Sequence, residues 1–285
     1  YMAKNTVFIH TNNKQLLGAK IAHYAIFKHL NDKDSVDVKI INVDNLSIFK
    51  DFSNKKYLRK GTEITYNPQD LQSFTLSRFM PPQLMNYEGN AVVIDPDIFP
   101  LIDINQLFNI ELQNNAIACC PKKDDWDTSV MLMDCSQLKH WRIENIINDL
   151  INKKTDYVDW MSLKMEKNIL PLPREWNSLD SLSDETKLLH TTQRLTQPWK
   201  TGLPIDFTRN KLPKLFGLIP REWVLKIRGK YPSKYQAHPD KNIERFFIQL
   251  IKESLENNFV SREFIEKEIE AKHVRPDLLL LIDKS

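Results

Sequence analysis

The first 45 residues of the chain contain two short apolar runs on either side of a helical pattern. The runs Thr6–Thr11 ("TVFIHT") and 37–43 ("DVKIINV") are rich in β-branched residues, which favour strands. Between them, residues 18–30 carry apolar side chains at helical spacing. A strand, a helix and a strand in this order indicate a βαβ unit and therefore a parallel sheet.

Further elements follow the same rules. The run 91–94 ("AVVI") is apolar throughout and predicts a strand buried on both faces. Two more strands are predicted at 115–121 and 129–135. Helices are predicted at 67–85, with Pro68 in the first turn and a break at Pro81-Pro82, at 103–110, with Asp103 as N-cap, and at 135–154.

The texture changes after residue 164. Residues 164–202 contain three prolines and are predicted to form a loop, whereas the chain beyond Pro220 is predicted to be helical and is highly charged, with one apolar face that includes Ile243, Phe247 and Ile251. We therefore expect an α/β fold with a mixed, mostly parallel sheet flanked by helices. It would form one domain, residues 1–207, followed by a helical C-terminal extension, residues 208–285, packed on it.

Composition narrows the function classes. The 285 residues are 41% hydrophobic and carry a net charge of +3 with both signs interspersed, so we expect no nucleic-acid partner. Cys119, Cys120 and Cys135 lack metal-ligand spacing and predict reduced, buried thiols in a cytoplasmic protein. No apolar run approaches the ~20 residues of a membrane span, and the first ten residues do not resemble a signal peptide. Only six glycines occur, and neither GxGxxG nor GxxxxGK[ST] is present, so side chains and a metal would have to hold any phosphates.

The stretch "AVVIDPDIFP" raises a question of charge. Asp95 and Asp97 follow a buried strand, and two carboxylates this close repel each other unless something positive joins them. Open α/β sheets bind ligands at the carboxyl ends of their strands, and Mg²⁺ or Mn²⁺ takes carboxylates together with substrate phosphates. A plain Asp-Pro-Asp turn is the alternative interpretation.

A second stretch, "LLHTTQRLTQPWKTG", places His190 before a basic, aromatic loop that contains Arg194, Trp199 and Lys200. A lone histidine is more often structural. In this setting, however, His190 could complete a metal shell while the loop closes over an anionic ligand.

The order of these segments resembles that of the GT-A glycosyltransferases, in particular family 8, which includes glycogenin-like and lipopolysaccharide galactosyltransferase-like members. The resemblance spans residues 6–202. It rests on five stretches in order: "TVFIHTNNKQLLGAKIAHYAIFKH", "SFTLSRFMPPQLMNYEGNAVVIDPDIF", "WDTSVMLMDCSQLKHW", "DYVDWMSL" followed by "LPREWNSLD", and "HTTQRLTQPW".

The resemblance implies a role for individual residues. Metal ligation falls on Asp95, Asp97 and His190. Nucleotide binding falls on His10, Thr11, Asn12, Arg78, Ile94 and Asp95, and contact with the donor sugar on Asp127, Thr128 and Ser129. An acidic residue facing the transferred sugar is either Asp156 or Asp159, and the sequence does not choose between them.

Some positions depart from the family pattern. Asp127 replaces an asparagine and Ser129 a glycine. The loop after His190 is one residue longer, lacks its glycine and has Gln197 where the family has a lysine that supports the leaving diphosphate. Arg194 or Lys200 would then supply that charge.

The resemblance thus implies a glycosyltransferase that depends on Mn²⁺ or Mg²⁺ and uses a nucleotide sugar, most simply a UDP-sugar, with retention of configuration. The acceptor, whether glycan, lipid or protein, stays open. The alternatives are a GT-A-like nucleotide-binding scaffold with weak or no catalysis, and a nucleotidyltransferase, which usually has a glycine-rich basic loop that this chain lacks. The C-terminal helices are expected to cap the catalytic domain; acceptor binding, docking of another domain and oligomer formation are further interpretations.

Overall fold

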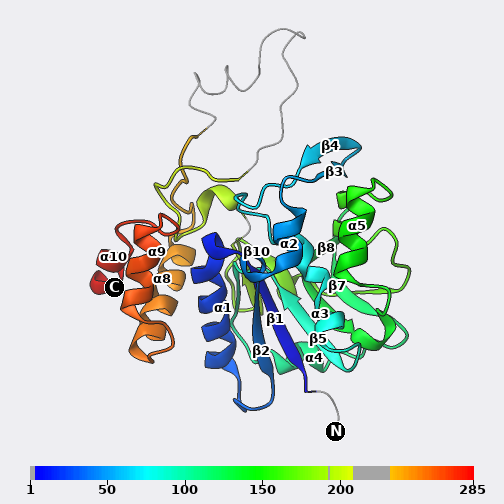
Figure 1. Cartoon of the computed structure of the whole chain (residues 1–285). Coiled ribbons are helices and arrows are strands. Elements are labelled where there is room, and N and C mark those ends of the chain that lie inside the picture. The colour runs from blue at the N-terminus through cyan, green and yellow to red at the C-terminus, as the bar shows by residue number, and fades with distance from the viewer. Residues whose placement is uncertain (1–3, 192, 208–231) are drawn as a thin grey trace.

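A computed structural model describes residues 4–191, 193–207 and 232–285. At its centre is a six-stranded sheet in the order β2-β1-β5-β8-β7-β9 (Figure 1). Its strands are β1 (Thr6–Thr11), β2 (Asp37–Asn42), β5 (Asn90–Ile94), β7 (Ile117–Pro121), β8 (Trp126–Asp134) and β9 (Ile169–Pro171). All run in one direction except β8, which is antiparallel to both of its neighbours. The expected mixed, mostly parallel sheet is confirmed.

Apolar side chains of the central strands alternate between two hydrophobic clusters, one on each face of the sheet. In β1, Val7 and Ile9 belong to one cluster and Phe8 to the other. In β5, Val92 and Ile94 alternate in the same way with Val93. Both faces are therefore buried, which explains why these strands are apolar throughout rather than alternating.

The helices form two layers over these faces. Figure 1 shows α1 and the C-terminal helices on one side of the sheet and α5 on the other. The helices are α1 (Leu16–His29), α2 (Ser47–Phe52), α3 (Pro81–Leu84), α4 (Asn105–Phe108), α5 (Ile143–Ile151), α6 (Tyr157–Met161), α8 (Lys241–Glu256), α9 (Arg262–Glu270) and α10 (Leu278–Lys284). Short 3₁₀ turns occur at 13–15, 43–45, 75–79, 135–137, 174–177 and 194–196.

Two smaller sheets lie beside the central one. In the order β10-β11-β6, strands β10 (Ser178–Leu179), β11 (Leu188–His190) and β6 (Ile98–Pro100) pair, which sets His190 opposite Ile98 and so next to the Asp95–Asp97 turn. The hairpin of β3 (Lys56–Arg59) and β4 (Thr62–Thr65) turns through Lys60 and Gly61.

Several expected elements need correction. Residues 67–85 do not form one helix but turns, a 3₁₀ segment and the short α3, since Pro81 and Pro82 begin a new helix. Residues 164–202, expected to be loop, contain β9, β10 and β11. The predicted helix over 135–154 begins only at Ile143, and the β3–β4 hairpin was not predicted.

Other expectations concern thiols, membranes and domains. All three cysteines are free and buried, as predicted. Within the part of the chain that the structure describes, no helix is both long and apolar enough to span a bilayer. The domain division at residue 207 stays a prediction, and residues 208–231 of the expected extension lie outside the described residues. Helix α8 shares the hydrophobic cluster of α1 and the sheet through Phe247 and Ile251.

Candidate metal and substrate site

A cavity of about 340 Å³ opens where β5 ends and β8 begins. Polar residues from several segments far apart in the sequence line most of it. Among them are Gln15, Arg59, Arg78, Asp95, Asp97, Lys122, Asp127, Thr128, Ser129, Tyr157, His190, Arg194 and Gln197. The cavity thus brings together eight of the residues predicted from the sequence: Arg78, Asp95, Asp97, Asp127, Thr128, Ser129, His190 and Arg194.

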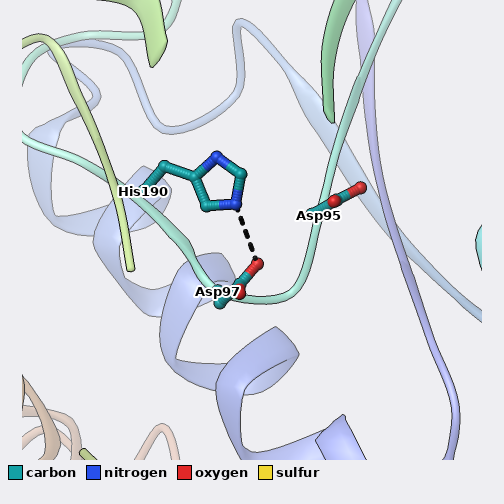
Figure 2. A group of neighbouring side chains, drawn as sticks. All are labelled: Asp95, Asp97 and His190. Atoms are coloured by element: carbon teal, nitrogen blue, oxygen red, sulfur yellow. Dashed lines mark ion pairs between the residues drawn. The ribbon is translucent and has the colours of Figure 1, made fainter. Parts of the chain in front are cut away.

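The three predicted metal ligands converge at this cavity. Asp95 and Asp97 lie on the turn between β5 and β6, closed by the bond from the Ile98 amide to the Asp95 carbonyl. Strand β11 delivers His190 beside it (Figure 2). One ligand atom from each of the three residues lies within 4.8 Å of the others. Pairing of β11 with β6 is therefore what unites residues that are almost 100 positions apart.

The carboxylate of Asp95 is held by two basic groups. Arg78 Nη2 donates to Asp95 Oδ1 at 2.8 Å, and His10 Nε2 lies 2.6 Å from the same oxygen. Burial acts to raise the pKa of Asp95, but Arg78 and His10 outweigh it and hold the pKa below its usual range. Asp95 is therefore ionised without any added ion.

Asp97 meets a different environment. His190 Nε2 lies 3.5 Å from its Oδ1, and Gln197 Nε2 donates to its Oδ2 at 3.1 Å. Burial and the negative charge of Asp95 raise the pKa of Asp97 to about 6, although His190 and Gln197 oppose this. No permanently charged cation pairs with Asp97 among the described residues, so its ionised form lacks a counter-charge.

A chain of hydrogen bonds orients His190. Its Nδ1 lies 2.8 Å from Asn177 Oδ1, Asn177 Nδ2 donates to Ser129 Oγ at 3.1 Å, and the Ser129 hydroxyl donates to Asp127. Because Nδ1 donates to an amide oxygen, Nε2 presents its lone pair toward Asp97. Such a fixed tautomer is typical of a metal-ligating histidine.

These observations test whether a divalent cation fits the site. Two carboxylates and one imidazole nitrogen are hard or borderline ligands of the kind that Mn²⁺ accepts. The excess negative charge at Asp97 calls for a positive partner, and the oriented Nε2 offers a third ligand atom. The residues therefore fit a divalent ion.

The segment predicted to contact the donor sugar lies at the start of β8, beside the end of β5, where the Asp95 amide donates to the Ser129 carbonyl at 3.1 Å. Asp127 is largely buried, and its Oδ2 lies 3.6 Å from Lys122 Nζ. Burial acts to raise its pKa, but Ser129 and Lys122 lower it overall, so Asp127 is ionised. Thr128 accepts a hydrogen bond from Arg78 and donates to the Met161 carbonyl at 3.0 Å. Arg78 thereby connects the donor-sugar segment with Asp95.

The predicted nucleotide-binding residues of the first loop do not reach the cavity. His10, Thr11, Asn12 and Ile94 are at most 1% exposed and are not among its lining residues. Asn12 Nδ2 donates to the carbonyls of Asp70 and Leu71 and to Ser73 Oγ, which fixes the segment that borders the cavity. Their direct contact with a nucleotide stays a prediction; in the structure His10 supports Asp95 instead.

Neither carboxylate expected to face the transferred sugar lines the cavity. Asp156 caps α6 and accepts from the amides of Val158 at 2.8 Å, Lys60 at 3.0 Å and Gly61 at 2.7 Å. Asp159 pairs with Lys164 at 2.9 Å. Asp156 therefore ties the tip of the β3–β4 hairpin to α6, and the structure does not bring either residue to the cavity.

Arg194 and Lys200, the two residues predicted to supply positive charge to the leaving group, lie in different surroundings. Arg194 lines the cavity, whereas Lys200 does not. Lys200 is fully buried, with its Nζ 3.6 Å from Asp206 Oδ2 and 5.6 Å from the centre of the Tyr235 ring, and burial lowers its pKa to about 8. Of the two, only Arg194 can face a ligand in the cavity.

Sequence reasoning missed other residues of the site. Asn177 orients His190, Gln15 Nε2 donates to Gln197 Oε1 at 3.1 Å, and Arg59 lines the cavity from the hairpin. The signal for the hairpin is the Lys60-Gly61 pair between two short β-prone runs. Both residues have positive φ, 52° and 68°, as a two-residue hairpin turn requires.

The chain was compared with known protein families, curated proteins and solved structures. No protein-family model matches the chain. It is 23% identical over 219 residues to Protein CDI of Arabidopsis thaliana, which covers 70% of this chain and 78% of that protein. The glycosyltransferase GlyE of Streptococcus pneumoniae TIGR4 is similar in structure, with a TM-score of 0.49, 17% identity and coverage of 83% of this chain.

The chain corresponds to 66% of the GlyE chain, just under two thirds of its length. The galactosyltransferase LgtC, solved in complex with donor and acceptor sugar analogs, is also similar. It has a TM-score of 0.42, 8% identity and coverage of 68% of this chain and 89% of that one.

Proposed function

We propose that this chain is a glycosyltransferase that uses a divalent metal ion and transfers a sugar from a nucleotide-linked donor, with UDP as the carrier, to an acceptor hydroxyl. The observation that carries the proposal is the convergence of Asp95, Asp97 and His190, within 4.8 Å, at the wall of a polar cavity beside the end of β5. A divalent ion held there supplies positive charge to the diphosphate oxygens.

The cations of the cavity would stabilise the leaving group. When the bond between the sugar and the diphosphate breaks, negative charge grows on the phosphate oxygen. Arg194 lines the cavity without a carboxylate partner among the described residues, so its guanidinium is available to that charge. Arg78 is occupied by Asp95 and Thr128 and would act mainly by holding them in place.

Gln197 takes a different role from the lysine of the family pattern. It is buried and donates to Asp97 Oδ2, while its own oxygen accepts from Gln15. A neutral amide cannot stabilise a leaving phosphate by charge. It can, however, fix the direction of the Asp97 carboxylate, so that Oδ1 faces His190.

Proton transfer needs no additional base in this chain. The three carboxylates among the described lining residues are Asp95, Asp97 and Asp127, and each is engaged by neighbours in the cavity. In a same-face, retaining transfer the departing phosphate oxygen accepts the proton of the attacking hydroxyl. Asp127, ionised and in the donor-sugar segment, would then contact sugar hydroxyls or the developing positive charge at C1.

A panel of nucleotide sugars with and without Mn²⁺, read out as released nucleoside diphosphate, tests the proposal. We expect release from one donor only with the metal. Arg194→Ala should lower kcat by about 10²–10³ and donor affinity by a smaller factor, because the charge it meets is largest in the transition state. If Lys200→Met slows turnover and Arg194→Ala does not, the leaving-group role belongs to Lys200. If nucleotide and metal bind but no donor turns over, the chain is a nucleotide-binding scaffold.

A further inference from the structure

Two arginines face the cavity from elements that the metal cluster does not use. Arg59 ends β3 at the base of the hairpin turn, and Arg194 begins the 3₁₀ turn after β11. Both line the same cavity as Asp95 and Asp97. They are about 135 residues apart in the sequence, and the fold brings both to the same cavity.

Neither guanidinium is neutralised by the protein. Within the described ranges, no carboxylate forms an ion pair with Arg59 or Arg194. By contrast, two other cations of the cavity, Arg78 and Lys122, pair with Asp95 and Asp127. The charge of Arg59 also contributes, after burial, to lowering the pKa of Arg194, so the two like charges are near enough to repel.

Aromatic rings fix the direction of both side chains. The Arg59 guanidinium carbon lies 4.9 Å from the centre of the Tyr157 ring, and that of Arg194 lies 5.6 Å from the centre of the Phe207 ring. Stacking over a ring leaves the N–H groups at the guanidinium edge free to donate. An unpaired arginine held in this way is prepared for an oxyanion, which it can bind with two parallel hydrogen bonds.

The hairpin is anchored in a way that keeps Arg59 at the cavity. The Asp156 carboxylate accepts from the amides of Lys60 and Gly61, directly after Arg59, and from the Val158 amide at the start of α6. Tyr157, which carries the ring under Arg59, is the next residue in α6. Asp156 therefore positions both the arginine and its aromatic support.

We propose that Arg59 and Arg194 together form an oxyanion-binding pair in the cavity, distinct from the metal cluster, which binds an anionic group of the substrate. This inference rests on the proposed function for the identity of the substrate, a nucleotide sugar. Two groups of such a substrate share the required chemistry: the diphosphate, and a carboxylate on an acidic sugar.

Binding measurements separate these two sources. The probes are inorganic pyrophosphate, UDP, UDP-glucose and UDP-glucuronate, each titrated into the full chain with Mn²⁺ in excess. Arg59→Gln removes the charge, and Arg59→Lys keeps it but removes the two-pronged geometry. Lys55→Gln is the matched control, because Lys55 is an exposed cation beside the same hairpin and does not line the cavity.

We expect Arg59→Gln to weaken binding by about 10- to 100-fold, as for loss of a hydrogen-bonded charge pair. Arg59→Lys should fall between this variant and the wild type, and Lys55→Gln should change nothing. An equal loss for all four probes assigns the pair to the diphosphate. A loss confined to UDP-glucuronate assigns it to a sugar carboxylate. The double variant Arg59→Gln/Arg194→Gln should lose less than the product of the two single losses if both residues hold one anion.

The inference is overturned if the wild type binds none of the probes, or if Arg59→Gln binds all of them as the wild type does while its thermal unfolding is unchanged. Its fate is separable from that of the proposed function, because binding is measured rather than turnover. Arginine-dependent binding without sugar transfer from any donor would overturn only the proposed function. Sugar transfer with binding indifferent to Arg59 would overturn only the pair.

Discussion

Asp95 and Asp97 lie two residues apart on one turn, yet their surroundings shift the pKa values of the two carboxylates in opposite directions. On the Asp95 side, Arg78 and His10 converge on a single carboxylate oxygen and lower its pKa. On the Asp97 side, a neutral amide and an imidazole are the neighbours, and the pKa rises to about 6. The charge of Asp95 is therefore balanced by Arg78, whereas Asp97 has no arginine or lysine as an ion-pair partner among the described residues.

The difference teaches where a bound cation would act. A bound cation would add little stabilisation at Asp95, since Arg78 already balances the charge of that carboxylate. Among the described residues, Asp97 has His190 and the neutral Gln197 as side-chain partners, so a bound cation would compensate its ionised form. We therefore expect metal binding, pH and the stability of the fold to be coupled through Asp97, while Asp95 is principally a structural charge that also offers a ligand oxygen.

The largest expected effect is a difference between Asp95→Asn and Asp97→Asn in the free energy of unfolding. Asp95→Asn leaves the nearly buried Arg78 without its counter-ion, which should lower the free energy of unfolding by about 3 kcal/mol or more in the metal-free protein. Asp97→Asn removes an uncompensated buried charge and should leave that free energy unchanged or higher at pH 7.5. Urea denaturation in EDTA measures both. Equal losses for the two variants would contradict the asymmetry.

The pH dependence of the metal-free protein should follow Asp97. Its pKa is raised in the folded state from 3.8 to about 6. Its contribution to stability is therefore fully present below its ordinary pKa and is lost as the pH rises through about 6. The expected loss between pH 4.5 and pH 7.5 is about 2 kcal/mol from this group alone.

Mn²⁺ should reverse that trend, because it competes with the proton at Asp97. The increase in melting temperature caused by a fixed Mn²⁺ concentration should be small at pH 5 and grow toward pH 7.5. In Asp97→Asn both the loss and its reversal should disappear. A metal effect of equal size at pH 5 and pH 7.5 would argue against Asp97 as the titrating ligand.

A substitution at Gly18, which packs against the turn between Asp95 and Asp97, tests whether the geometry of that turn matters. A Cβ on Gly18, in α1, would lie 2.6 Å from the Pro96 carbonyl oxygen and 3.1 Å from the Trp199 ring. Gly18→Ala must therefore displace the turn between the two aspartates, at about 1–3 kcal/mol of stability. We expect Mn²⁺ affinity, measured by calorimetry, to fall with it. A variant that is destabilised but binds Mn²⁺ normally would show that the turn geometry is not limiting.

The smallest expected effect concerns the amide behind Asp97. Gln197→Ala removes the donor to Asp97 Oδ2 and the acceptor of Gln15. Loss of such a supporting hydrogen bond typically weakens metal binding by about 10- to 100-fold, and we expect the lower end because His190 is retained. Gln193→Ala, exposed in the same loop, is the matched control. If both variants bind Mn²⁺ equally, Gln197 does not position the carboxylate.

The sequence predicted those parts of the molecule that rest on local pattern. Apolar runs predicted β1, β2 and β5, and the Asp-Pro-Asp stretch predicted two of the three candidate metal ligands because charges directly after a buried strand need an explanation. His190 was predicted from its basic, aromatic loop and from the resemblance of that loop to the family pattern. Its partner Asn177 became visible only with the fold, since a hydrogen bond between residues 13 apart leaves no spacing signature.

The structure separates other predicted site residues for physical reasons. Arg194 and Lys200 look alike in sequence, but Lys200 follows Trp199, which is fully buried between Phe99 and Phe247, and so points into the molecule. Asp156 and Asp159 were equal candidates for the acidic residue that faces the transferred sugar. The Asp156 carboxylate instead accepts hydrogen bonds from three backbone amides. Side-chain direction depends on tertiary packing, which a single sequence does not record.

The most direct test of the site is calorimetric titration of UDP into the wild-type protein, once with Mn²⁺ and once with EDTA, at pH 7.5. We expect UDP to bind at least about tenfold more tightly with Mn²⁺, within the usual range of coupling between two ligands, and this difference to vanish in Asp97→Asn. UDP affinity that is the same with Mn²⁺ and with EDTA, in the wild type and in Asp97→Asn alike, would contradict the assignment of Asp95, Asp97 and His190 as the metal site of a nucleotide-sugar transferase.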